Sequence, residues 1–290
     1  MGFSSNDDFI NEVTVNGKYW RQDFNKITGA AAYTAGRWYN MGGLTGTPVA
    51  SAWSGTSLAA QIPTDTSGYG MWHGGNVSTD TKHIINVSAV TSAATGAPSM
   101  LMLCDICLYY PGINMNSSSA QNLTNASTLT RYTDGAGLRA ALFITATSGA
   151  TAHSISMSYT NQDGTSGRAL PVTVSCTASA IVPHITHSGT AANNYGPFLP
   201  LASGDTGIRS VESITLSAAS GSGTAVLALY RPLLTIPLAV ASIASERDLM
   251  NQLPSMPQVR DGACLVWLLF TGAATAASTT FLGSVDFAWG

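Results

Sequence analysis

The sequence predicts a mainly β protein made of two tandem, duplicated modules of the β-sandwich or jelly-roll type, behind a short helical N-terminal arm. Three observations support this: apolar and polar residues alternate in several segments, Gly/Ser turns separate them at hairpin spacing, and a long stretch of sequence occurs twice. We expect the arm over residues 1–40, the first module over 41–163 and the second over 164–290. A chain of 290 residues is long enough for such an organisation.

The arm carries the clearest helix signal. Ser5 is a good N-cap, and Asp8 follows three positions later in an S-x-x-D capping pattern. Asn16-Gly17 interrupts a rough apolar face that continues through the arm, formed by Phe9, Ile10, Val13, Trp20, Phe24 and Ile27. A second short helix is predicted over 244–252, before Pro254, whereas its counterpart in the first module, 117–128, is Ser/Asn-rich and predicts a loop.

Strands are predicted throughout both modules. Apolar and polar residues alternate with a period of two, which marks strands with one buried face, in residues 154–160, 172–178 and 213–218. Other runs are apolar on both faces, which is typical of central or covered strands: 101–103, 140–144, 225–230 and 265–270. Turns such as Thr95-Gly96-Ala97-Pro98 and Ser220-Gly221-Ser222-Gly223 lie between them.

The internal repeat consists of three matches in the same order. Asp80-Thr81 and the following SAVTSAATGAPSMLML correspond to Asp205-Thr206 and SITLSAASGSGTAVLAL, at an offset of 125 positions (205 − 80). DGAGLRAALFITATSGAT from Asp134 matches DGACLVWLLFTGAATAAS from Asp261, at an offset of 127 (261 − 134), and YGMWHGG matches YGPFLPL at an offset of 126 (195 − 69). Matches at nearly one offset predict a duplication.

Charge is unusually low. Charged residues make up 9% of the chain and hydrophobic residues 45%, whereas an average soluble domain is about 25% charged. The lysines are only Lys18, Lys26 and Lys82, and lysine is depleted in interface cores. We interpret this composition as extensive burial against other subunits. The alternative is a low-charge extracellular β protein.

Several function classes lack their usual signals. The net charge of −3 is spread out, so direct nucleic-acid binding has no basic patch to support it. No apolar run is long enough for a membrane span, and MGFSSNDDF has no features of a signal peptide. We therefore expect no membrane partner and synthesis in a cytoplasm.

The residue types that usually bind metals are not arranged for it. Cys104 and Cys107 form a C-x-x-C on a predicted strand, where positions three apart face opposite sides, so we expect buried free thiols. His184 and His187 form an H-x-x-H on an extended segment, which we interpret as polar loop histidines, and His73 as structural. We predict no metal and no cofactor.

No catalytic residues are predicted. Asp134 and Asp261 occupy matching D-G positions of the repeat, which favours turn geometry over a catalytic pair. Nucleophile-elbow, Walker, Rossmann and zinc-protease motifs are all missing from the sequence. The tryptophans are scattered, so core and interface packing is their expected role.

Four segments between Tyr159 and Phe270, with WRQDFNK in the arm, resemble virion structural proteins of tailed bacteriophages: YTNQDGTSGRALPVTVSC, SGTAANNYGPFLPLASGDTG, ERDLMNQLPSMP and RDGACLVWLLF. The similarity extends over most of the chain. The resemblance implies a non-enzymatic, head-associated decoration or cement protein in the virion, assembled in the host bacterial cytoplasm. These segments carry no assigned functional residues, so no site is transferred.

The resemblance also implies partners. We expect the major capsid protein and further copies of this chain, with a trimer favoured because shell decorations commonly sit on threefold positions. The arm is expected to lie against a neighbour through Trp20, Phe24, Trp38 and Tyr39. The alternatives are a tail, baseplate or fibre component, a receptor- or glycan-binding virion protein, and, least favoured, a polysaccharide-degrading enzyme.

Overall fold

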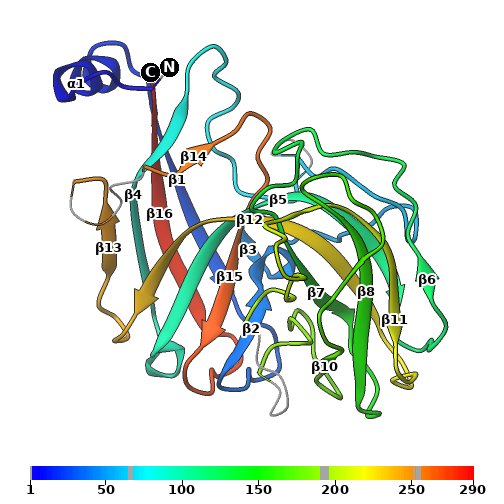
Figure 1. Ribbon diagram of the computed structural model, residues 1–290. Coiled ribbons are helices and arrows are strands. Elements are labelled where there is room, and N and C mark those ends of the chain that lie inside the picture. The colour runs from blue at the N-terminus through cyan, green and yellow to red at the C-terminus, as the bar shows by residue number, and fades with distance from the viewer. Residues whose placement is uncertain (1, 65–67, 190–195, 251, 253–255) are drawn as a thin grey trace.

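The computed structural model describes residues 2–64, 68–189, 196–250, 252 and 256–290. It confirms a mainly β chain with one short N-terminal α-helix, α1 (Asn6–Thr14), in which the Ser5 side chain caps the Asp8 N–H at 3.0 Å as the sequence predicts. Two 3-10 turns, η1 (Met41–Gly43) and η3 (Ala94–Gly96), are the other helical segments among the described residues. The strands form three antiparallel sheets (Figure 1).

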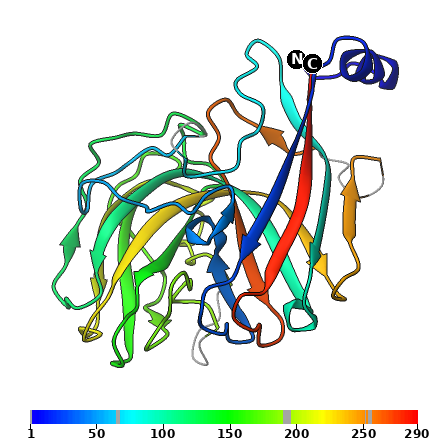
Figure 2. The same cartoon turned by 180° about the vertical axis from the view of Figure 1, so that it is seen from behind.

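The central sheet runs through the whole molecule. Its order is β2-β15-β5-β12-β7, formed by β2 (Arg37–Asn40), β15 (Leu265–Thr271), β5 (Ser99–Asn114), β12 (Thr224–Leu238) and β7 (Arg139–Ala146). β5 and β12 are the longest strands, with 16 and 15 residues, and they curve across both halves of the molecule (Figures 1 and 2). The predicted apolar runs 101–103, 140–144, 225–230 and 265–270 all lie in this sheet, where both faces are covered.

Two further sheets cover the same face of the central sheet, one at each end. The β4 sheet has the order β13-β4-β16-β1-β3, and β14 also pairs with β4; its strands are β13 (Ser245–Asp248), β4 (Lys82–Thr91), β16 (Thr280–Trp289), β1 (Tyr19–Ile27), β3 (Gly46–Thr47) and β14 (Gln258–Val259). The β8 sheet has the order β10-β8-β11-β6, and β9 pairs with β8; its strands are β10 (Val174–Cys176), β8 (His153–Asn161), β11 (Ile208–Leu216), β6 (Gln121–Asn122) and β9 (Arg168–Ala169).

The apolar core has three parts. One lies between the β4 sheet and the central sheet, around Phe24, Val285 and Trp267. A second lies between the β8 sheet and the central sheet, where the alternation predicted for residues 154–160 buries the odd-numbered side chains of β8. The third lies on the opposite face of the central sheet, under loops that carry Trp53 and Ile185. Burial on both faces explains why the central strands are apolar throughout.

The strand registers repeat with the offset seen in the sequence. Leu101 pairs with Ile236, and Tyr110 pairs with Leu227, so each residue of one pair is 126 positions from a residue of the other (227 − 101 and 236 − 110). The same holds for the strand pairs on either side of β5–β12, where Val266 pairs with Cys104 and Arg139 with Tyr230 (266 − 139 is 127, 230 − 104 is 126). The two halves of the central sheet are therefore related by an approximate two-fold arrangement of strands.

The two predicted modules are interleaved. Every pairing between named strands of residues 41–290 joins one strand from 41–163 to one from 164–290, including β5–β12, β4–β16 and β8–β11. The predicted boundary at 163/164 lies in the turn after β8. Each sheet thus needs both segments.

Two secondary-structure predictions are wrong. Residues 19–27 and 37–40 are not part of a helical arm, because they form β1, paired with β16 over nine positions, and β2, paired with β15. The short helix predicted over 244–252 is instead edge strand β13, in register with β4 from Ser245↔Ala89 to Asp248↔Asn86. In both cases pairing with a long neighbouring strand overrides local helix preference.

Candidate functional site

The four residues expected at an interface occupy different environments. Phe24, Trp38 and Tyr39 are 2%, 6% and 0% exposed, packed in the cores on the two faces of the central sheet. As the chain is folded here, these three side chains have no surface to offer a neighbouring subunit. Trp20 is 39% exposed and lies against Gly74, so it remains available.

An exposed apolar surface is found around α1. This helix has no fully buried residue and projects from one corner of the molecule (Figures 1 and 2). It borders a groove of about 380 Å³ lined by Phe3, Ser4, Ser5, Asn6, Phe9, Ile10, Leu249, Met250 and Met256. Ile10 is 55% exposed and Met250 73% exposed. We call these residues the α1 corner. Exposed apolar surface of this kind is typical of contact with another protein.

The cysteines confirm the prediction of buried free thiols. Cys104 and Cys107 are 0% and 1% exposed and belong to cores on opposite faces of β5. Burial raises the pKa of both thiols well above the usual value, and that of Cys176 to about 12. Thiols held neutral in this way are poor nucleophiles and poor metal ligands.

His184 and His187 lie outside the named strands, as expected for loop residues, but the expected polar surroundings are wrong. Both side chains are 0% exposed, and burial lowers the pKa of each to about 3. The Leu142 N–H donates to His187 Nε2 at 3.4 Å, and the His184 ring lies 5.2 Å from the Tyr39 ring. His73 agrees with its structural interpretation, since it is buried with Nδ1 3.1 Å from Lys82 Nζ.

The aspartates of the repeat hold backbone in place. Asp134 Oδ1 accepts the Ala136 N–H at 3.1 Å, which is the expected turn geometry. Asp261 instead accepts the N–H groups of Val77 and Ser78, at 2.9 and 3.2 Å. Asp80 forms an ion pair with Lys18 at 2.8 Å. Lys18 also pairs with Glu12 at 2.7 Å, so the two carboxylates of this ion-pair cluster share one ammonium group.

A buried ion pair lies where the two halves of the central sheet meet. Asp105, 1% exposed, accepts from Arg131 Nε at 3.0 Å and Nη2 at 2.9 Å, and the Cys264 N–H donates to Asp105 Oδ1 at 2.8 Å. Arg131 Nη2 also donates to the Ile106 carbonyl at 2.9 Å. The carboxylate and the guanidinium are thus paired and hydrogen-bonded, as buried charges must be.

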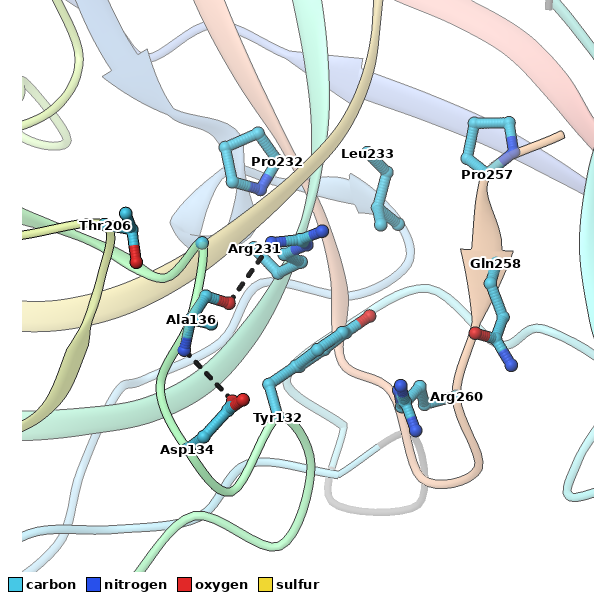
Figure 3. Close-up of a pocket in the computed structure, with 11 residues that line it drawn as sticks. Tyr132, Asp134, Ala136, Thr206, Arg231, Pro232, Leu233, Pro257, Gln258 and Arg260 are labelled. Carbon is cyan, nitrogen blue, oxygen red and sulfur yellow. Dashed lines mark hydrogen bonds between the residues drawn. The ribbon is translucent and has the colours of Figure 1, made fainter. Parts of the chain in front are cut away.

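A pocket of about 640 Å³ lies beside this ion pair. Its lining residues come from the 132–137 loop, from Thr206 before β11, from β12 and from the 257–260 segment: Tyr132, Asp134, Ala136, Gly137, Thr206, Arg231, Pro232, Leu233, Pro257, Gln258 and Arg260. Figure 3 shows the Tyr132 ring between the Arg231 and Arg260 side chains. Their guanidinium carbons lie 5.4 and 5.0 Å from the ring centroid. We call this the arginine pocket.

Local structure places Arg231 in this pocket. Its Nη1 donates to the Ala136 carbonyl at 3.2 Å, and the guanidinium lies so close to Gly137 that a side chain there would overlap it. Gly137 also has φ of +74°, which favours glycine. Sequence reasoning missed Tyr132, Arg231 and Arg260 because no motif connects them.

Across the described parts of the chain, no group of three or more His, Cys, Asp or Glu side chains is arranged to hold a metal ion. Among the same residues, no helix has the length and apolar character to cross a membrane.

Comparison with known proteins identifies no family. No protein-family model matches the chain, and no curated protein matches it. Among solved structures, the chain is similar to the infectious bursal disease virus VP2 subviral particle at 8% identity and a TM-score of 0.20, over 96% of this chain and 85% of that one. At this TM-score the likeness carries no argument about fold or function.

Proposed function

We propose that this chain is a non-enzymatic structural protein of a virion, a decoration or cement protein that binds the head shell of a tailed bacteriophage. The observation that carries the proposal is the low charge and the exposed apolar area of the surface. Only 9% of the residues are charged, and large apolar side chains are exposed at the α1 corner. Such a surface loses little hydration when another subunit covers it.

A β-sheet protein with few charges suits a role in which many copies bind to a repeating shell lattice. Apolar burial contributes roughly 25 cal/mol per Å² before the costs of association. Repetition over a lattice makes modest contacts sufficient through avidity. The proposed partners are the major capsid protein and further copies of this chain, with a trimer as the proposed oligomer.

We place the contact with the shell at the α1 corner. Residues 1–40 cannot be removed as a unit without loss of β1 and β2 from their sheets. Residues 1–17 contain α1 alone, and α1 buries none of its residues. Deleting 1–17 should therefore leave the β circular dichroism spectrum intact and abolish binding to purified shells.

A matched pair of point variants tests whether an added charge weakens shell binding only at the α1 corner or at any exposed site. Ile10→Glu adds a carboxylate to the α1 corner, whereas Val172→Glu adds one at an exposed valine, 43% exposed, outside it. We expect Ile10→Glu to weaken shell binding about tenfold or more and Val172→Glu to change it little. Equal effects of the two variants would show that the corner has no special role.

The copy number of the chain in purified particles tests the function itself. A ratio to the major capsid protein near one, or a simple fraction of it, supports a head decoration. A handful of copies per particle would favour a tail, baseplate or fibre component, and absence from particles would refute any virion role.

We also propose that the chain arose by duplication of one β-rich unit. Support comes from the sequence matches at offsets of 125 to 127 and from strand registers that repeat at 126 and 127. In this proposal the two copies fold as one interleaved body, with strands of one copy paired to strands of the other in every sheet.

A further inference from the structure

The two halves of the repeat differ in charge at one pair of corresponding positions. Asp105 on β5 corresponds to Arg231 on β12, since the two are directly paired and 126 positions apart (231 − 105). Arg131 corresponds to Gln258 at the offset of 127 that relates Asp134 to Asp261 (258 − 131). One half therefore holds a carboxylate and a guanidinium, and the other holds a guanidinium and an amide.

Because of this difference, the second half has no carboxylate at the position that corresponds to Asp105. Asp105 and Arg131 neutralise each other in the first half at 2.9 Å. In the part of the chain that the structure describes, neither Arg231 nor Arg260 forms an ion pair. Two guanidinium groups on one aromatic ring repel each other, and an anion between them and the solvent would relieve that repulsion.

The carboxylate nearest in the lining does not fill this role. Asp134 Oδ1 accepts the Ala136 N–H, as Figure 3 shows, and among the described residues no ion pair joins Asp134 to Arg231 or Arg260. Gln258, in contrast, lies near Arg260 in the pocket lining and can donate its amide N–H groups. Pro232, Leu233 and Pro257 add an apolar wall.

We propose that the arginine pocket binds a carboxylate group supplied by another molecule, held by Gln258 and Arg260, while Arg231 on the other face of the Tyr132 ring adds positive charge. Guanidinium groups bind carboxylates through short, charge-assisted hydrogen bonds. The pocket volume of about 640 Å³ accommodates a small polycarboxylate or an acidic side chain of a peptide. This inference does not depend on the virion role.

Isothermal titration of the full chain at low salt tests the proposal with three probes: citrate, a tetraglutamate peptide and inorganic phosphate. We expect citrate or the peptide to bind, and the tighter of the two identifies the source of the carboxylate. Binding of neither at millimolar concentration, or phosphate binding as tightly as the better carboxylate, would overturn the proposal.

Variants place the binding in this pocket. Arg260→Gln removes an exposed arginine and should weaken binding about tenfold. Arg209→Gln is the matched control, because Arg209 is an exposed arginine outside the pocket. Gln258→Glu supplies a carboxylate within the chain and should abolish binding while raising the melting temperature. Equal weakening by Arg260→Gln and Arg209→Gln, or full binding by Gln258→Glu, would refute the site.

Discussion

Asp105 and Arg231 lie directly opposite each other in the β5–β12 pair, yet the carboxylate of Asp105 is bound by Arg131 and not by Arg231. Directly opposite residues share a face of the sheet, so the two side chains are neighbours that turn in different directions. Asp105 is held by a loop of its own half, and Arg231 reaches the Ala136 carbonyl. The centre of the molecule thus holds one complete ion pair and one arginine without a carboxylate.

The Asp105–Arg131 pair should be strongly coupled in stability. Asp105→Asn and Arg131→Gln each leave one buried charge unpaired, which costs about 3–5 kcal/mol. The double variant removes both charges and should cost clearly less than the sum, with a coupling of roughly 1 kcal/mol or more. Urea unfolding of the four proteins measures the cycle. Additive effects would show that the pair contributes through its separate hydrogen bonds alone.

Stability should fall as pH decreases below neutrality because of His184 and His187. Burial lowers the pKa of each to about 3, whereas the value in an unfolded chain is about 6.5. Between these values the unfolded chain binds more protons, so stability rises with pH, by at most roughly 5 kcal/mol for each histidine.

Unfolding free energies measured from pH 4.5 to 7 test this dependence above the range in which most carboxylates titrate. His187→Gln keeps an acceptor for the Leu142 N–H but cannot be protonated. It should reduce the slope, and His184→Gln/His187→Gln should reduce it further. An unchanged slope in the double variant would assign the pH dependence to other groups.

The four cysteines should be unreactive in the folded chain. All are buried, and burial raises the pKa of Cys104, Cys107 and Cys176. A colourless aromatic disulfide reagent should release dye only as fast as the chain unfolds, and all four thiols should react in concentrated urea. Rapid reaction of one thiol without denaturant would reveal local opening at that strand.

Local patterns predicted the strands well but not their partners. The alternation in 154–160 and the apolar runs of the central sheet depend only on which side chains are buried. The order of polar and apolar residues in the sequence reflects this burial directly. β1 was assigned to the helical arm because Trp20, Phe24 and Ile27 continue the apolar face of its helix in the sequence, and β13 to a short helix before Pro254. Pairing with β16 and β4 makes them strands. Pairing between residues more than 100 positions apart has no local signal.

The site residues were also hard to predict from local sequence alone. An exposed and a buried aromatic residue look alike in sequence, so Trp20 could not be separated from Phe24, Trp38 and Tyr39. The arginine pocket did have a signal: extending the repeat alignment by two residues past Leu103 and Leu229 places Asp105 opposite Arg231. A charge reversal between aligned copies identifies a position whose partner has changed.

The interleaved sheets predict how the chain behaves when it is divided. In the described structure β5 pairs with β12 and β15, both from the second segment, so 1–163 alone leaves its longest strand without either neighbour. The fragment 164–290 likewise loses both neighbours of β12. Each fragment alone should be unfolded or aggregated, because unpaired strands expose backbone groups and apolar faces.

Co-expression of the two fragments should restore the fold. A cut in the turn at 163/164 breaks no pairing between long strands, so the fragments should assemble into a one-to-one complex with the β spectrum of the intact chain. Size-exclusion chromatography with circular dichroism of each fragment and of the mixture decides the matter. If either fragment alone gave a cooperative thermal transition, the segments would be self-contained modules, and the shared sheets would not be needed for folding.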